Sequence, residues 1–159
     1  MPDISAEYLL VTPAGTIDFN DDGLDQFYIQ EIPTGLAGAP IRAPMDPVGF
    51  GDGGRSYNFW AGARHIVVEG VFLITSTRNM NAILTIRNQM EEDLRVALDS
   101  IAQTDVDTAT LTWTPLGQTT RTLVVRNDVP LECPHDQNYL LRAFQFGLVA
   151  DDPAWVEST

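Results

Sequence analysis

The chain has 159 residues, 44% of them hydrophobic, which suits one domain with its own core and is too short to expect two. Its 22 acidic and nine basic residues, the latter all arginine, give a formal net charge of −13, which disfavours binding to nucleic acid or to anionic membrane surfaces. No run of about 18 apolar residues occurs, no signal-peptide pattern is found, and the lone Cys133 cannot form an internal disulfide. We therefore expect synthesis in the cytoplasm and no membrane insertion.

Short strands are predicted in the first part of the chain, at residues 8–12, 16–19 and 26–32. A Pro-Ala-Gly turn follows the first strand, and the cluster Asn20-Asp21-Asp22-Gly23 follows the second. In the third strand Phe27 and Ile29 share one face.

A long segment without steady periodicity follows, from residue 35 to residue 62, with seven Gly and three Pro. Loops of this length are uncommon in compact domains and tend to be functional. Either the segment folds back on its own core, or it docks on another chain, which we favour because a flexible linker would not carry so many large apolar side chains. These are Ile41, Met45, Val48, Phe50, Tyr57, Phe59 and Trp60.

Residues 63–74 are the clearest predicted strand, because apolar residues occupy both faces, as in a strand covered on both sides. Ile66, Val68, Phe72 and Ile74 lie on one face. Gly70 interrupts the strand and indicates a bulge or a close approach of another backbone.

A helix is predicted at about residues 77–102, since apolar residues recur there at helical spacing, and Ser76 or Thr77 is the expected cap. A helix with a single apolar face covers one side of a sheet. Its predicted stripe is Met80, Ile83, Leu84, Leu94, Ala97, Leu98 and Ile101.

The last part of the chain predicts strands at residues 108–114, 119–127 and 139–150, with a short piece around Leu131. Strands, one helix and strands again indicate an α+β domain that is mainly β.

Residues that could carry chemistry are few. His65 lies inside a predicted strand, where a packed or hydrogen-bonded histidine is the ordinary case, and Cys133 and His135 are too close in sequence to resemble a nucleophile–base pair. The acidic clusters at 20–23 and 105–107 lack the spaced ligands of a calcium loop and are better explained as turns. No phosphate-binding, nucleophile-elbow or zinc-protease motif occurs, so we expect no enzyme, catalytic residue, cofactor or metal.

Three segments carry a resemblance to a known family. They are the GAPIR segment at residues 38–42, within the stretch 35–42, the GAR-x-I-x-V-x-G pattern at 62–70, and the A-x-DPAW sequence at 150–155. In this order, after an N-terminal hairpin, they resemble the distal tail protein (Dit) of long-tailed bacteriophages or a closely related minor tail protein.

The resemblance implies a β-sandwich with one flanking helix, forming a hexameric ring that joins the tail tube to the tip or baseplate. The implied partners are identical copies, the tail tube protein and tip or hub proteins, and the implied location is the tail of the virion, after synthesis in the host cytoplasm. DNA would pass through the lumen without specific binding, and an acidic wall would repel its phosphates. Many relatives have a second, carbohydrate- or partner-binding domain, whereas residues 1–159 are expected to form a single tail-ring domain without one.

The segment at 35–62 is then the candidate arm that reaches a neighbouring subunit. Exposed aromatic side chains are typical anchors of such contacts. The predicted subunit-interface residues are Arg42, Phe50, Tyr57, Phe59, Trp60 and Trp155.

Three alternatives remain open. A tail tube subunit shares the ring plan but is present in many more copies per particle. A carbohydrate-binding module would stack sugars on Trp60, Trp113 or Trp155. An enzyme centred on Cys133 and His135 would lose its activity on Cys133→Ala.

Overall fold

The computed structural model describes residues 7–21, 23–29, 33–36, 41–42, 45–47, 54–56, 60–61, 63–102, 107–115, 117–134, 142–152 and 154–157. They contain one helix and twelve strands, which confirms the prediction of a mainly β chain with a helix. The elements are β1 (Glu7–Thr12), β2 (Gly15–Phe19), β3 (Asp25–Tyr28), β4 (Ile41–Arg42), β5 (Met45–Pro47), β6 (Gly54–Ser56), β7 (Trp60–Ala61), β8 (Arg64–Ile74), α1 (Met80–Asp99), β9 (Ala109–Thr114), β10 (Arg121–Glu132), β11 (Arg142–Ala150) and β12 (Val156–Glu157).

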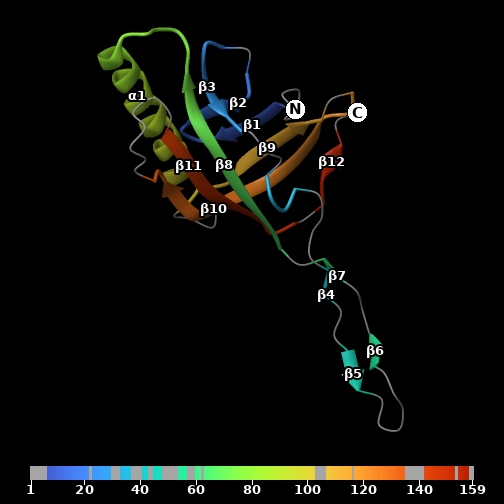
Figure 1. Cartoon of the computed structure of the whole chain (residues 1–159). Coiled ribbons are helices and arrows are strands. Elements are labelled where there is room, and N and C mark those ends of the chain that lie inside the picture. Colours follow the sequence, from blue (N-terminus) through green and yellow to red (C-terminus); the bar gives the residue numbers. More distant parts are fainter. Residues whose placement is uncertain are drawn as a thin grey trace.

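Seven of these strands form a closed barrel in the order β11, β8, β3, β2, β1, β9 and β10 (Figure 1). Closure depends on β10, whose first half pairs with β9 while its second half pairs with β11. The β2–β3 pair is parallel, and β12 is added alongside β10.

The predicted β-sandwich is therefore wrong. Strand β10 is one long strand where the sequence indicated residues 119–127 and a separate piece near Leu131. Its pairing with β11 shifts register on both sides of Val129, and such irregularities bend a strand. Opposite them lies Gly147, where an added Cβ would stand 2.7 Å from Asp128 Oδ1 and 2.8 Å from Val129. The close approach of β10 and β11 at this glycine turns an open sheet into a barrel.

The barrel is filled by a group of phenylalanines from β2, β3, β8 and β11. Neighbouring rings lie between 5.0 Å and 6.4 Å apart, within the range of favourable aromatic pairs. The group consists of Phe19, Phe27, Phe72, Phe144 and Phe146.

Gly70 lies where β8 passes between β3 and β11. A Cβ at this position would stand 2.4 Å from the Tyr28 carbonyl oxygen and 2.6 Å from Phe144 Cζ. The predicted close backbone approach is confirmed.

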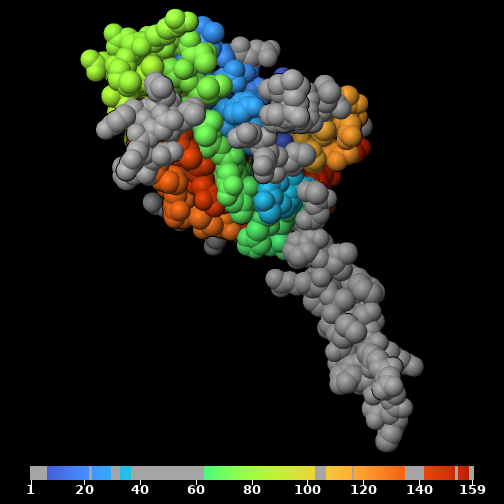
Figure 2. All heavy atoms as spheres, in the orientation of Figure 1, coloured from blue at the N-terminus to red at the C-terminus, as the bar shows by residue number. Residues whose placement is uncertain are grey.

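Helix α1 packs against β10, β8 and β2 along one side of the barrel, and its side chains form a continuous surface beside the end of β8 (Figures 1 and 2). The predicted cap is wrong: Asn79 caps the helix, its Oδ1 accepting from the backbone N of Asn81 at 3.0 Å and of Ala82 at 3.3 Å. Most of the predicted stripe is buried, but Met80 is 46% exposed. Among the described residues no helix is both long and apolar enough to cross a bilayer.

The segment between β3 and β8 contains two nested strand pairs. Ile41 pairs with Ala61 in β4–β7, and Met45 pairs with Ser56 in β5–β6, so the backbone runs out and returns as a hairpin. In Figure 1 both pairs lie beyond the end of the barrel at which β8 begins. We call residues 41–61 the arm.

Candidate functional site

Three segments that are far apart in the sequence meet where the arm leaves the barrel. They are Thr34–Leu36 before the arm, Arg64 at the start of β8, and Trp155 near the end of the chain. We call Thr34, Gly35, Leu36, Arg64 and Trp155 the arm root. Two of the three motifs that carry the resemblance contribute a residue to it, namely Arg64 and Trp155.

Backbone hydrogen bonds join the segments of chain that precede and follow the arm. Thr34 N donates to the Val67 carbonyl at 3.1 Å, and Val67 N donates to the Thr34 carbonyl at 3.0 Å. Gly35 follows with φ of +89°, and a Cβ there would stand 1.9 Å from the His65 carbonyl oxygen. A glycine is required at this crossing because any side chain would overlap the backbone of β8.

Arg64 is buried, with 6% of its surface exposed, and its Nη1 donates to the Leu36 carbonyl at 2.6 Å and to the Gly35 carbonyl at 3.3 Å. Burial lowers the pKa of its guanidinium below the usual value. Burying a cation without hydrogen-bond partners is energetically costly. The two carbonyl contacts avoid this cost, and they thereby hold Gly35 and Leu36 next to Arg64.

Trp155 completes the arm root. Its Nε1 donates to the Leu36 carbonyl at 3.3 Å, and Arg64 Cζ lies 5.5 Å from its ring centroid. The Trp113 ring centroid lies 5.7 Å from that of Trp155, with the two rings tilted by 52°, and Arg121 Cζ lies 5.9 Å from the Trp113 ring centroid. Each tryptophan thus has an arginine over its ring, and cation–π attraction stabilises such a contact by about 0.5–1 kcal/mol.

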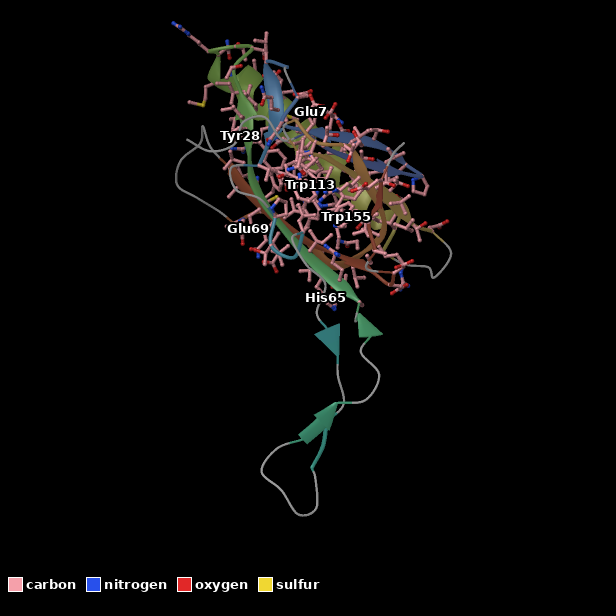
Figure 3. All side chains as sticks on the ribbon, turned by 90° about the vertical axis from the view of Figure 1, so that its right-hand side faces the viewer. Glu7, Tyr28, His65, Glu69, Trp113 and Trp155 are labelled. Atoms are coloured by element: carbon pink, nitrogen blue, oxygen red, sulfur yellow. The ribbon has the colours of Figure 1, made fainter. Side chains whose placement is uncertain are left out.

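His65 lies next to the arm root, at the end of β8 that leads to β7 (Figure 3). It is exposed, and its Nδ1 is 2.9 Å from Asp128 Oδ2 on β10. The prediction of a hydrogen-bonded strand histidine is confirmed, and the pair links β8 to the irregular part of β10.

Cys133 lies half-buried beside α1. Burial and the nearby Glu91 raise the pKa of its thiol, which favours the neutral form over the thiolate that nucleophilic catalysis requires. Glu91 is itself paired with Arg95 at 2.8 Å and Arg142 at 3.1 Å. His135, the other half of the enzyme alternative, lies outside the described residues.

The described residues include no group of three or more His, Cys, Asp or Glu side chains placed to hold a metal ion. Asn20, at φ of +58°, uses its side chain to close the turn: Oδ1 accepts from Ile29 N at 2.7 Å and Nδ2 donates to the Ile29 carbonyl at 3.1 Å. The turn interpretation of residues 20–23 is therefore supported by its described part. Residues 105 and 106 lie outside the described residues.

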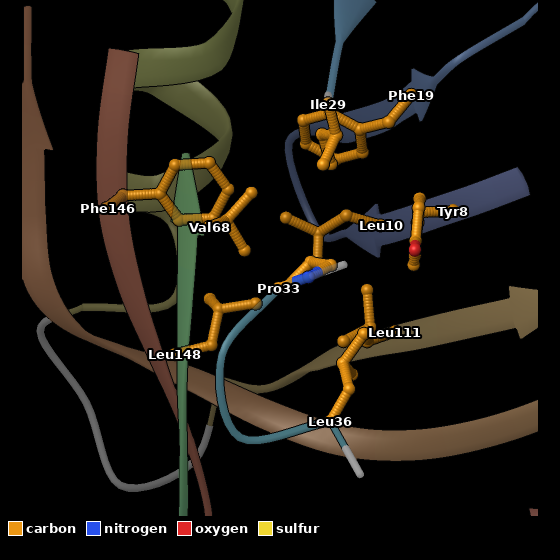
Figure 4. A pocket seen from close by; sticks show the side chains of 10 residues that line it. All are labelled: Tyr8, Leu10, Phe19, Ile29, Pro33, Leu36, Val68, Leu111, Phe146 and Leu148. Atoms are coloured by element: carbon orange, nitrogen blue, oxygen red, sulfur yellow. The ribbon is translucent and has the colours of Figure 1, made fainter. Parts of the chain in front are cut away.

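A small space inside the barrel, close to the arm root, has a wholly apolar lining and room for about one water molecule (Figure 4). It offers no polar group to orient a ligand. Its lining residues are Tyr8, Leu10, Phe19, Ile29, Pro33, Leu36, Val68, Leu111, Phe146 and Leu148.

The predicted interface residues fall into three groups. Arg42 and Trp60 are paired positions of β4 and β7 in the arm, and Trp155 lies in the arm root. Phe50, Tyr57 and Phe59 lie outside the described residues. Sequence reasoning missed the role of Arg64; the available signal was an arginine at the start of an apolar strand, directly after a Gly-rich segment.

No family model and no curated protein sequence matches the chain. Solved structures do match. The crystal structure of the Dit protein of phage SPP1, a hub adsorption apparatus protein of phages that infect Gram-positive bacteria, is 16% identical with a TM-score of 0.62, covering 95% of this chain and 52% of its own. Two structures of the phage p2 baseplate in its activated conformation, with Sr and with Ca, are each 10% identical with a TM-score of 0.51, covering 90% of this chain and 43% of theirs.

The chain therefore spans about half the length of the solved structures it matches. At these identities the likeness is one of fold, and it extends over nearly the whole chain. The chain has the fold of a phage distal tail and baseplate protein, and the resemblance that its three motifs indicated is confirmed.

Proposed function

We propose that the protein is a structural component of a bacteriophage tail, in which six copies form a ring at the distal end and join the tail tube to the tip or baseplate. The observation that carries this proposal is the fold shared with the SPP1 Dit protein over 95% of the chain. In this proposal the protein is part of the virion and carries out no reaction.

The arm root supports the proposed use of the arm. An arm that contacts a neighbouring subunit needs a defined direction, since a freely moving segment loses conformational entropy when it docks. The base of the arm is held in place by two backbone hydrogen bonds, by the Arg64 contacts with two carbonyls, and by the contact between Arg64 and the Trp155 ring. The proposed contact residues beyond this anchor are Arg42, Phe50, Tyr57, Phe59 and Trp60, with Trp155 at the base.

The net charge of −13 supports a further part of the proposal, namely that acidic side chains line a passage for DNA. A negative wall repels phosphates and prevents the DNA from binding as it passes. A map of the electrostatic potential of the assembled ring tests this part directly. A neutral or basic lumen with the acidic residues outside would contradict it.

The carbohydrate-binding alternative is less well supported. Sugar-binding tryptophans present a free ring face, whereas Arg64 lies over the Trp155 ring and Arg121 lies over the Trp113 ring. The tail tube alternative differs in copy number, and counting subunits per particle separates it from a distal ring.

The test is negative-stain electron microscopy of the concentrated protein, together with a variant in which a short Gly/Ser linker replaces residues 41–61. We expect rings of six for the wild type and monomers for the armless variant. The Thr34–Val67 hydrogen bonds lie outside the replaced residues and join the segments on either side of them, so the variant is expected to retain the barrel's circular dichroism and melting curve.

Two point variants test the role of the arm with a smaller change. Trp60→Ala in the arm is expected to weaken ring formation, whereas Met80→Ala, which truncates a half-exposed side chain on α1, is expected to leave it unchanged. Wild-type protein that forms no six-fold assembly, or an armless variant that forms the same ring, would contradict the proposal.

A further inference from the structure

The last described strand, β12, is attached to the barrel by few contacts. Glu157 pairs with Arg121 of β10, and Val156 pairs with Thr122. Val156 is 65% exposed, and the ion pair between Arg121 Nε and Glu157 Oε1 is long, at 3.5 Å, and lacks hydrogen-bond geometry. Exposed ion pairs of this kind add little stability. The pairing of β12 with β10 is therefore a local contact that can open while the barrel stays folded.

The residue directly before β12 is Trp155, which belongs to the arm root. Its Nε1 donates to the Leu36 carbonyl at 3.3 Å, and the same carbonyl accepts from Arg64 Nη1 at 2.6 Å. Arg64 Cζ also lies 5.5 Å from the Trp155 ring centroid. Because Val156 follows Trp155 in the chain, the pairing of β12 fixes the backbone from which the Trp155 side chain reaches Leu36.

On the other side of Trp155 the chain is firmly anchored. Strand β11 ends at the fully buried Ala150, and Asp151 contacts Arg126 at 2.5 Å. Residues 151–154 are the whole connection from Ala150 to Trp155, which limits how far Trp155 can move. An opening of β12 therefore leaves Trp155 close to the arm root, where it can bind again.

Trp155 is the one member of the arm root that does not come from the chain next to the arm. Leu36 precedes the arm and Arg64 follows it, and the Thr34–Val67 hydrogen bonds join these same two segments. If Trp155 leaves, these contacts still attach the arm to the barrel, but the Leu36 carbonyl and the Arg64 guanidinium each lose a partner. The arm then has more directions available to it.

We propose that β12 is a latch that sets the direction of the arm. While β12 is paired with β10, Trp155 is held on the Leu36 carbonyl and the arm keeps one direction. When β12 opens, Trp155 leaves the arm root and the arm can change its direction. The latch acts on the arm that the proposed ring uses, but it works within a single chain, so its test requires no ring.

The test measures the direction of the arm by double electron–electron resonance between two nitroxide labels in a Cys133→Ser background. One label is placed on Arg42→Cys in β4 and the other on Glu69→Cys, at an exposed position of β8. Dilution with unlabelled protein restricts the measurement to distances within one chain. We expect a narrow distance distribution. Val156→Gly/Glu157→Gly, which disfavours the strand, is expected to widen it at least about twofold.

The matched control is Val156→Thr/Glu157→Thr, which removes the same side chains, and the ion pair with them, but keeps a residue that favours strands at both positions. We expect the control to keep the narrow distribution. Trp155→Ala is expected to widen the distribution as much as the two glycines do. Because β12 acts through Trp155, the triple variant that combines Trp155→Ala with the two glycines should be no wider than Trp155→Ala alone.

A wide distribution with the unchanged β12 would overturn the inference, as would a narrow one with the two glycines. A triple variant that is wider than Trp155→Ala would also overturn it, because β12 would then act by another route. Melting curves check that the barrel of each variant is folded. The latch and the ring are tested separately: widening with the two glycines supports the latch even if electron microscopy shows no ring, and rings without widening support only the ring.

Discussion

Gly35 illustrates how one residue controls the geometry of the arm root. It has a positive φ of +89°, and a Cβ would overlap the His65 carbonyl oxygen at 1.9 Å. Gly35→Ala is therefore expected to lower the free energy of unfolding by more than about 3 kcal/mol, because both the backbone conformation and the space are lost. Chemical denaturation followed by circular dichroism measures the change.

Gly117 provides the control, because it shares the positive φ, at +69°, but has nothing within 4 Å of the added Cβ. Gly117→Ala is expected to cost only about 1 kcal/mol, the penalty of the left-handed conformation alone. Equal losses of unfolding free energy in Gly35→Ala and Gly117→Ala would show that the close approach of Gly35 to β8 contributes nothing.

Asp18 makes the stability of the protein depend on pH in a defined direction. Burial, followed by repulsion from Asp21 and Glu7, raises the pKa of its carboxyl above the usual 3.8. A raised pKa means that the folded state binds the proton more tightly, so this group favours folding at low pH and this contribution is lost as the pH rises through the folded pKa.

Asp18→Asn is therefore expected to raise the melting temperature at neutral pH, with a gain that shrinks toward zero when the pH falls below the usual pKa of 3.8. Glu132→Gln, which removes the same charge from an exposed position on β10, controls for the change in net charge. An equal gain from both variants at neutral pH would indicate a general charge effect and contradict the local one.

At the scale of elements, the start of α1 is set by a contact with a distant strand. Asp25 on β3 accepts from the backbone N of Thr75 and Ser76, both at 3.2 Å, and from Ser76 Oγ at 2.7 Å. Because Ser76 is bound to Asp25, it does not cap the helix, and Asn79 is the N-cap residue instead.

Asn79→Ala is expected to lower the free energy of unfolding by about 1 kcal/mol, the usual cost of losing a cap that satisfies two N–H groups. Asn81→Ala, at an exposed position two residues later, is expected to stay within about 0.5 kcal/mol of the wild type. Urea denaturation of the three proteins measures both values. A loss at position 81 as large as that at 79 would contradict the assignment of the cap.

At the scale of the whole molecule, Trp155 connects the last described segment of the chain to the base of the arm. Trypsin can report on this connection, since Arg64 lies in the arm root while Arg42 and Arg55 lie in the arm. Cleavage after the buried Arg64 requires local opening of the arm root, whose population depends on the contacts that hold it.

Trp155→Ala is expected to accelerate cleavage after Arg64 about tenfold, equivalent to about 1.4 kcal/mol of lost contacts with Arg64 and Leu36. Trp155→Phe keeps an aromatic ring beside Arg64 but loses the N–H donor. Its rate of cleavage after Arg64 is therefore expected to lie between those of the wild type and Trp155→Ala. Val156→Ala, at a residue that is 65% exposed, is the control. Mass spectrometry of the fragments identifies each cut, and unchanged cleavage after Arg64 in Trp155→Ala would contradict the proposed connection.

The local patterns of the sequence were sufficient for most strands of the barrel and their faces, but not for the short strands β4–β7 and β12. Ile66, Val68 and Phe72, predicted to share one face of a strand, are all buried on the inner side of β8. On the other face of the same strand, His65 and Glu69 are exposed. Alternation reports correctly on these positions because side chains of a strand point to opposite sides whatever the strand pairs with.

The closure of the barrel and the assembly of the arm root were decided only by the tertiary structure. Inward alternation is the same in a sandwich and in a barrel, so it carries no information on whether β10 also reaches β11. In the arm root, the Leu36 carbonyl accepts from Arg64 and Trp155, which are 28 and 119 positions away in the sequence. A backbone carbonyl is present at every residue, so only the folded chain determines which carbonyl a buried arginine and a tryptophan select.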